Sequence, residues 1–317
     1  MFEPTQAHYQ SVVRGMLQGK VVPFLGVGVS MAGRPVDAPW RVGRYLPDSR
    51  ELATHLAGTF DYPPGDLLDL LRVSQFIQIM AGSGPLYDEL RQVFDADYPP
   101  NSLHALLARF PRLVRERVVK QYQLIVTTNY DDALERAFLA AGEEFDLVNY
   151  IADGEHRGRF RHFRPDGRCS VIERPNEYSD LSLDRRTIIL KIHGAVDRQD
   201  SERDSYVITE DHYIDYLTRT DISNLVPVTA VAKIRRSHFL FLGYSLRDWN
   251  LRVILHRIWG GQALTYRSWA IQLDTHPVER ESWGRRGVEI LYASLDDYAE
   301  QLSAQLDAYL LPSGPGE

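Results

Sequence analysis

Cysteine is almost missing from this sequence, since Cys169 is the only one among its 317 residues. A single thiol cannot form an internal disulfide, and it cannot supply the several thiolates of a cysteine-based zinc site. We therefore expect neither a disulfide framework nor a zinc site built on thiolates.

Excess positive charge and long apolar runs are also absent. The formal net charge of −7 argues against a general affinity for nucleic-acid backbones, which requires a basic face. No apolar run approaches the roughly 20 residues that span a bilayer, and residues 1–10 lack the charged-then-apolar order of a signal peptide. We expect a cytoplasmic protein without membrane or sequence-specific nucleic-acid partners.

What the sequence does contain is a globular composition, with 44% hydrophobic and 25% charged residues. Short apolar runs typical of buried parallel strands alternate with amphipathic helical patterns, which predicts an α/β fold. We expect a Rossmann-like, mostly parallel sheet with helices on both faces and an inserted α-helical module. The strands are expected at residues 21–25, 124–127, 187–192, 238–242, 268–273 and 288–292, and helices at 5–19, 131–142, 209–218, 222–235 and 295–311.

The whole chain, residues 1–317, is expected to form a single domain. Its core is assigned to residues 1–45 and 118–311, and the helical insertion to residues 46–117, where no strand pattern interrupts the helical ones. Residues 312–317 have the composition of a flexible tail. Residues 143–187 mix strand-like pieces with loops, and their order stays open.

The first expected strand runs directly into a glycine turn, VVPFLGVGVS. Gly26 and Gly28 allow a sharp turn and a close approach of the backbone to a ligand, and Ser30 is a suitable N-cap for a following helix. A phosphate or pyrophosphate would suit that place. However, Met31 stands where the dinucleotide fingerprint GxGxxG requires its third glycine, so an ordinary βα turn remains the alternative.

Polar residues follow three further strand ends. TTNYD (127–131) follows the second strand, His193 and Gly194 follow the third, and LGYSLRDWN (242–250) closes the fourth and is expected to open another helix at Asp248. Ligands of open α/β sheets bind at this edge. Helix capping by Asn129 or Asp131 is the alternative at the second turn.

In their order along the chain, GVGVS, TTNYD, KIHG and LGYSLRDWN resemble the SIR2 (sirtuin) superfamily, and most closely its SIR2-like branch in bacterial anti-phage defence NADases. The resemblance runs from Val21 to about Asp297, and the helical insertion matches only in kind. Three positions depart from the family pattern: Val27 replaces alanine, Thr128 replaces glutamine and Tyr244 replaces threonine.

This resemblance implies NAD⁺ as the substrate and assigns roles to residues at the strand ends. The catalytic residues would be His193, Asn129 and Asp131. The residues that bind NAD⁺ would be Gly26, Gly28, Ser30, Thr127, Gly243, Ser245 and Asp274. Deacetylating sirtuins carry a zinc module held by four cysteines, which this chain cannot build, so the resemblance implies no zinc and no deacetylation.

The implied reaction is the hydrolysis of NAD⁺ to nicotinamide and ADP-ribose by the NAD-depleting effector of an anti-phage defence system, acting through abortive infection. Two alternatives stay open: a non-catalytic sensor of NAD or ADP-ribose, and an ADP-ribosyltransferase. Such an enzyme must be restrained until needed, so the family also implies a homo-oligomer or a partner such as a HerA-like ATPase.

Overall fold

The computed structural model describes residues 2–35, 37–218, 227–245 and 266–310. Its strands are β1 (Val21–Leu25), β2 (Leu124–Thr127), β3 (Phe145–Tyr150), β4 (Phe160–Phe163), β5 (Cys169–Ile172), β6 (Thr187–Lys191), β7 (Gly194–Ala195), β8 (Ser205–Tyr206), β9 (His238–Leu242), β10 (Ser268–Gln272) and β11 (Val288–Tyr292). Its helices are α1 (Gln6–Leu17), α2 (Val27–Met31), α3 (Ser49–Thr59), α4 (Leu70–Met80), α5 (Ser83–Phe94), α6 (Ser102–Arg115), α7 (Ala133–Ala140), η1 (Pro175–Glu177), η2 (Ser201–Arg203), α8 (Glu210–Thr218), α10 (Val228–Arg235), α12 (Pro277–Gly284) and α13 (Leu295–Leu310).

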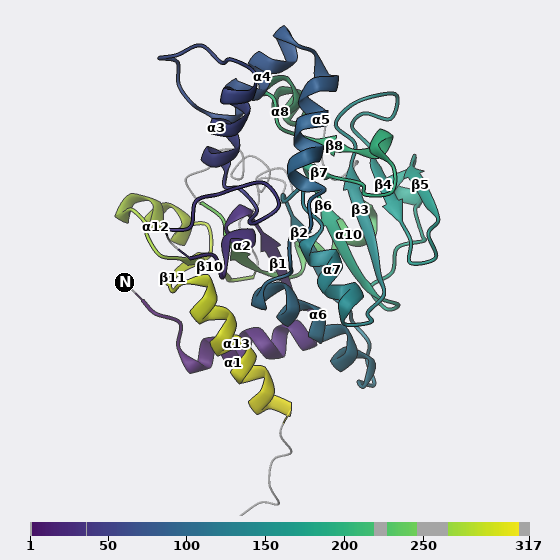
Figure 1. Ribbon diagram of the computed structural model, residues 1–317. Helices are drawn as coiled ribbons and strands as arrows, with labels where there is room; N and C mark the ends of the chain where they lie inside the picture. Colours follow the sequence, from purple (N-terminus) through teal and green to yellow (C-terminus); the bar gives the residue numbers. More distant parts are fainter. Residues whose placement is uncertain (1, 36, 219–226, 246–265, 311–317) are drawn as a thin grey trace, which may run out of the picture.

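Nine strands form one sheet in the order β11-β10-β9-β1-β2-β6-β3-β4-β5 (Figure 1). All neighbours from β11 to β3 pair in parallel. The strand β1 lies in the middle of the parallel part of the sheet, and its five residues are all buried. Val22 and Phe24 pack into one hydrophobic cluster while Val21 and Leu25 pack into another, because successive side chains of a strand point to opposite faces. A strand covered on both faces is therefore apolar throughout.

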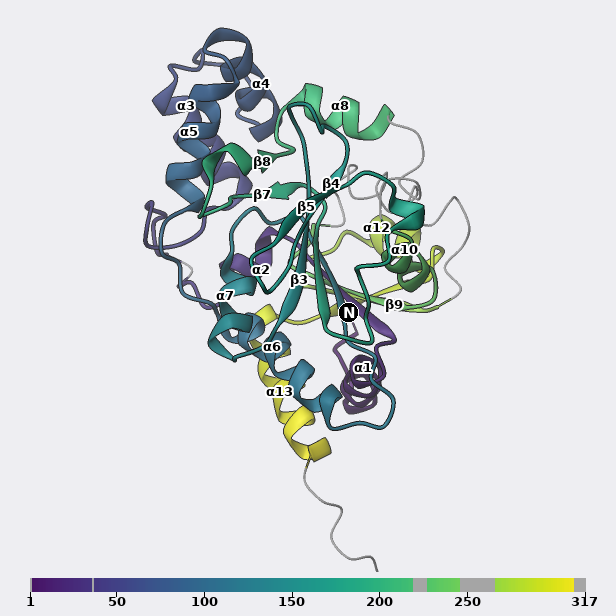
Figure 2. The same ribbon diagram turned by 90° about the vertical axis from the view of Figure 1, so that its right-hand side faces the viewer.

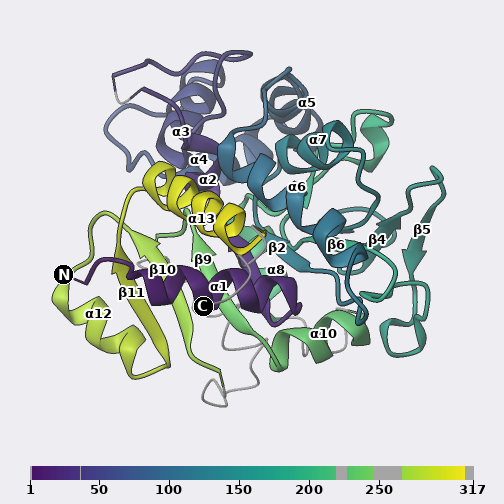
Figure 3. The same ribbon diagram turned by 90° about the horizontal axis from the view of Figure 1, so that it is seen from below.

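Helices cover both faces of this sheet. One cluster joins the sheet to α1, α6, α7 and α13, and the other joins it to α8, α10 and α12. Seen from below, α1 and α13 cross the same face of the sheet as α6 (Figure 3). The predicted fold class, a Rossmann-like and mostly parallel sheet between two helical layers, is confirmed.

The segment 46–117, predicted as a helical insertion, packs in two places. Helices α3, α4 and α5 form a third hydrophobic cluster with Tyr206 and Ile208, beyond the carboxyl ends of the strands, where they stand at the top of Figures 1 and 2. Helix α6 instead packs against α1, α7 and α13 on the sheet. The helices α3–α5 thus stand over the sheet edge where the polar turns lie.

Two features differ from the expectations. The helix α2 begins after Gly26 and contains Ser30 near its end, so the prediction of Ser30 as an N-cap is wrong. The sequence also did not order residues 143–187, where β4 and β5 pair in an antiparallel manner and extend the sheet beyond β3. These two strands have only four residues each, which is too short for a clear alternating pattern.

Some expectations fall outside the described residues: the helix expected from Asp248, the first part of the helix expected at 222–235, and the tail at 312–317. Within the described residues, no helix combines the length and hydropathy needed to cross a membrane.

Candidate active site

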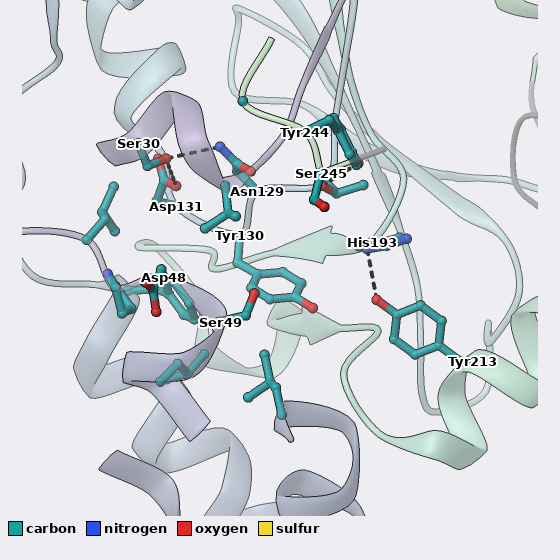
Figure 4. Close-up of a pocket in the computed structure, with 18 residues that line it drawn as sticks. Ser30, Asp48, Ser49, Asn129, Tyr130, Asp131, His193, Tyr213, Tyr244 and Ser245 are labelled. Atoms are coloured by element: carbon teal, nitrogen blue, oxygen red, sulfur yellow. Dashed lines mark hydrogen bonds between the residues drawn. The ribbon is translucent and has the colours of Figure 1, made fainter. Parts of the chain in front are cut away.

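The turns after β1, β2, β6 and β9 meet around one pocket, which helices α3–α5 close from the other side (Figure 4). Its open space is about 930 Å³, including the part that is continuous with solvent. The lining residues are Val27, Ser30, Leu46, Pro47, Asp48, Ser49, Leu52, Leu70, Phe94, Thr128, Asn129, Tyr130, Asp131, His193, Tyr213, Gly243, Tyr244 and Ser245. The pocket thus brings together residues from all four predicted turns.

A chain of hydrogen bonds fixes the polar wall of this pocket. The Asn129 amide donates from Nδ2 to the Ser30 hydroxyl (3.0 Å) and to the Gly26 carbonyl (3.2 Å). The Ser30 hydroxyl in turn donates to Oδ2 of Asp131 (3.0 Å), as the dashed lines in Figure 4 show. Because both donor positions of the Asn129 amide point to protein acceptors, its Oδ1 is the atom left to meet a ligand.

Asp131 is engaged by protein groups on both carboxylate oxygens. Its Oδ2 accepts the bond from Ser30, and its Oδ1 accepts a 3.0 Å bond from the Ala133 N–H in the first turn of α7. The sequence left open whether Asp131 bonds a helix amide or belongs to the site, and in the structure it does both. Asp131 acts on the pocket through Ser30 and Asn129.

His193 follows β6 and lines the pocket from the opposite wall. Its side chain is 6% exposed, and Nδ1 lies 3.5 Å from the Tyr213 hydroxyl. Within the described part of the chain, no protein group bonds to the buried Nε2. Burial lowers the pKa of His193 to about 3, because the charged imidazolium would lose its hydration. The imidazole is therefore neutral near pH 7, and one of its ring nitrogens is not engaged by any described residue.

Gly194 allows this histidine to sit where it does. Its φ of +81° is disfavoured for residues with a side chain, and a Cβ at this position would collide with the Ser205 backbone. Glycine thus lets the turn after β6 pass close to β8 while His193 stays at the pocket.

The two glycines of the first turn make room for another part of the protein. A Cβ on Gly28 would lie 2.7 Å from the Gly243 Cα, and a Cβ on Gly26 would lie 2.7 Å from the Gly243 carbonyl oxygen. The Gly28 N–H donates to the Gly243 carbonyl, and the Gly26 N–H donates to the Leu242 carbonyl, both at 2.9 Å. In this structure these two amides are therefore bonded to protein and not free to bind the pyrophosphate that the sequence assigned to them.

The remaining predicted residues are distributed around the site. Gly243 and Ser245 line the pocket directly. Asp274 lines a neighbouring hollow of about 780 Å³ that shares residues 243–245 with the pocket. Thr127 is buried behind the pocket, where its hydroxyl donates to the Leu25 carbonyl and accepts from the Asn129 N–H, both at 3.0 Å. Of the predicted site residues, six line the pocket: Ser30, Asn129, Asp131, His193, Gly243 and Ser245. Gly26, Gly28, Thr127 and Asp274 do not line it.

Three tyrosines at the pocket were not among the predicted site residues. The hydroxyl of Tyr244 donates to the Thr128 hydroxyl (2.6 Å), and that of Tyr130 donates to the Val207 carbonyl (2.7 Å). The ring of Tyr213 lies edge-on to His193, with centroids 5.4 Å apart. Tyr130 and Tyr244 stand inside the matched motifs and could have been singled out there. Tyr213 comes from α8, and nothing in the sequence connects it to His193.

Among the described residues, no group of three His, Cys, Asp or Glu residues is able to hold a metal ion. The atoms that suit NAD⁺ are Nε2 of His193, which has no partner among the described residues, and the oriented amide of Asn129, both of which the hydroxyls of a ribose would satisfy.

Similar proteins are found among curated relatives and solved structures. "Defense-associated sirtuin 2" of Bacillus subtilis is 26% identical over 313 residues, which cover 94% of this chain and 26% of that protein. "NAD(+) hydrolase ThsA" of Acinetobacter baumannii (strain 532279) is 26% identical over 262 residues, 81% of this chain and 43% of that protein. This chain thus spans less than half the length of either relative. A solved structure described as "Structural Basis for the Mechanism and Regulation of Sir2 Enzymes" aligns over 95% of this chain and 97% of that chain, with 11% identity and a TM-score of 0.46.

The family comparison covers the segment from β2 to β11. The family model described as SIR2-like domain matches residues 123–291, more than half of the sequence. The match includes the turns that carry Asn129, His193 and Gly243. The chain therefore belongs to the SIR2-like domain family.

Proposed function

We propose that this chain is an NAD⁺ glycohydrolase that cleaves NAD⁺ to nicotinamide and ADP-ribose, as the NAD-depleting effector of an anti-phage defence system. The observation that carries the proposal is the neutral His193, whose buried Nε2 has no partner in the described part of the protein and which lines the same pocket as Asn129. The printed names of the two relatives, a defence-associated sirtuin and an NAD(+) hydrolase, support it.

The reaction breaks the bond between C1′ of the ribose and the nicotinamide nitrogen. The bonding electron pair leaves with nicotinamide, which becomes neutral, and positive charge develops on the ribose as in glycoside hydrolysis. Water then adds its oxygen to C1′ and loses one proton. The balance is NAD⁺ and water giving nicotinamide, ADP-ribose and a proton.

Each predicted site residue has a role that fits its geometry. Asn129 Oδ1 would orient the attacking water or a ribose hydroxyl, while Asp131 holds Asn129 in place through Ser30. His193 would accept the proton, a role typically worth about 10²- to 10⁴-fold in rate for a base whose pKa lies near the working pH. Burial keeps the imidazole of His193 neutral, and by lowering its pKa it also makes it a weaker base than a free histidine.

The adenosine half of NAD⁺ is assigned to the turn after β9 and the hollow next to it. Ser245 would contact it from the main pocket and Asp274 from the neighbouring hollow. Gly26, Gly28, Gly243 and Thr127 would shape this wall by close packing, as their contacts indicate.

The test is to incubate the purified protein with NAD⁺ and to separate nicotinamide and ADP-ribose by chromatography. We expect both products from the wild type and from His156→Ala, a control at a histidine that lies outside the pocket and pairs with Glu173. His193→Ala and Asn129→Ala should remain folded and lose turnover. Wild-type rates in either folded variant would refute the assignment of that residue.

One observation favours a second function, a non-catalytic sensor of NAD or ADP-ribose. The Gly26 and Gly28 amides are bonded to protein carbonyls, so the glycine turn offers fewer donors for a phosphate than the family pattern implies. In the same experiment, bound NAD⁺ or ADP-ribose without product would identify a sensor. Radiolabel from NAD⁺ left covalently on a protein would identify an ADP-ribosyltransferase.

The proposal extends to the setting of the enzyme. We propose that it acts in the cytoplasm as a single SIR2-like domain within a homo-oligomer, with a HerA-like ATPase or another defence protein as regulator. The physical reason is that an unrestrained NAD⁺ hydrolase would harm its own cell. Light scattering at several protein concentrations, with turnover measured on the same samples, tests whether assembly and activity rise together.

A further inference from the structure

A buried ion pair lies behind the wall of the pocket. Lys191, the last residue of β6, is 1% exposed, and its ammonium group lies 2.7 Å from Oε1 of Glu135. Glu135 is in the first turn of α7 and is also buried. Neither residue lines the pocket, so the pair is not placed to touch a substrate.

The Lys191 ammonium also donates to the backbone carbonyl of Asp131. This bond makes Lys191 the start of a continuous chain of contacts that passes through Asp131 and Ser30 to the amide of Asn129. Lys191 itself lies two residues before His193 on the same strand end. One side chain thus connects the two turns that carry the proposed catalytic groups.

Stability alone gives little reason to keep such a pair. Removing two charges from water costs more than their attraction usually returns, and well-packed apolar residues are often as stable. Burial raises the pKa of Glu135, and the neighbouring Lys191 opposes this effect. The pair is therefore better explained by what it positions.

We propose that Lys191, held by Glu135, is a positioning residue that fixes the Asp131 turn and thereby the amide of Asn129 relative to His193. The inference rests on the proposed function for its effect on turnover. Its structural content, the fixing of the turn at 128–133, does not depend on that function. A displacement of about 1 Å of a positioned group can cost on the order of 10²-fold in rate, so loss of the lysine would be felt in catalysis.

The central experiment compares the double variant Lys191→Met/Glu135→Leu with the wild type. Lys191→Met alone leaves a buried carboxylate unpaired and should lower the unfolding temperature clearly. The double variant replaces both charges by apolar groups and should recover most of that loss. We expect its kcat to stay at least about tenfold below the wild type, with KM changed less than about threefold, because the turn is no longer fixed.

Two further variants separate positioning from general damage. Glu135→Gln leaves the buried ammonium without its counter-charge and should lower the unfolding temperature. The amide oxygen still accepts from Lys191, so the bond to the Asp131 carbonyl persists and kcat of the folded protein should stay closer to the wild type than in the double variant. The control is Arg115→Met/Glu143→Leu, which removes a partly exposed ion pair between the last residue of α6 and the segment after α7, outside the pocket. We expect that control to leave kcat unchanged.

Amide hydrogen exchange of residues 128–133 provides a readout that does not require turnover. Faster exchange there in the double variant than in the wild type and in the control supports the inference. Unchanged exchange, or a folded double variant with wild-type kcat, overturns it. If the wild type itself releases no nicotinamide, the proposed function fails, and the exchange measurement still decides the inference.

Discussion

The hydroxyl of Ser30 donates a 3.0 Å hydrogen bond to Oδ2 of Asp131, across the gap between the turn after β1 and the turn after β2. The same hydroxyl accepts the amide of Asn129. Asn129 and Asp131 therefore act together through a residue about a hundred positions away in sequence. This connection assigns Ser30 a structural task inside the site in addition to the ligand contact predicted for it.

Ser30→Ala tests this connection. The change leaves Asp131 Oδ2 without its donor and Asn129 Nδ2 without one of its acceptors, so we expect a loss of about 1–2 kcal/mol in unfolding free energy. A freer Asn129 should lower kcat by about 10- to 100-fold. Urea denaturation and the NAD⁺ cleavage assay measure the two effects.

The control for this change is Thr54→Ala, which removes an exposed hydroxyl on α3 that bonds only within its own helix. It should leave both stability and turnover nearly unaltered. A Ser30→Ala protein with the kcat of the wild type would show that Asn129 is oriented without the hydroxyl.

Much of this site could be predicted because each of its turns follows a strand with a strong pattern. Strands such as Val21–Leu25 are buried on both faces, so their sequences are continuous apolar runs. The polar residues that follow these runs lie at the edge of the sheet. Parallel pairing then brings Asn129 and His193 to the same edge, although they lie far apart in the sequence.

What the sequence could not reveal depends on contacts between distant elements. Tyr213 reaches His193 because α8 joins the same hydrophobic cluster as β6, and Asp48 reaches the pocket because α3 stands over the sheet edge. Lys191 lies in TIILKI, a run whose pattern predicts a buried strand and assigns no role to the lysine. A lysine at the end of an otherwise buried strand was the available signal, since such a charge needs a partner.

The contact between the glycine turn and Gly243 leads to a second prediction. In Gly28→Ala the new methyl group would lie 2.7 Å from the Gly243 Cα, a backbone atom that cannot move aside cheaply. We expect a loss of about 1–3 kcal/mol in unfolding free energy, typical of overpacking. Thermal and urea unfolding of the purified variant measure it.

Gly58→Ala is the matched control, because this glycine lies within α3 and a Cβ there meets no atom within 4 Å. Alanine in a helix should make it equally stable or more stable by up to about 1 kcal/mol. If both variants unfolded like the wild type, the close approach of Gly28 to Gly243 would not be needed for folding.

The buried histidines predict how the protein responds to pH. Burial lowers the pKa of His193 to about 3 and those of His8 and His104 to about 4, whereas unfolded histidine has a pKa of about 6.5. Between pH 6.5 and about 4 the unfolded chain therefore binds protons that the folded chain does not. Stability should fall as the pH decreases through this window.

The same lowered pKa of His193 predicts little change in turnover over this pH range, in contrast to the change in stability. Because His193 stays neutral in the folded protein, kcat/KM for NAD⁺ should show no decrease attributable to it between pH 8 and pH 5. Turnover measured over this range, with the folded fraction checked at each pH, decides the matter. A tenfold decrease with a midpoint near pH 6.5 in protein that stays folded would mean that His193 titrates as an exposed histidine and is not held in the desolvated setting that makes it a neutral base.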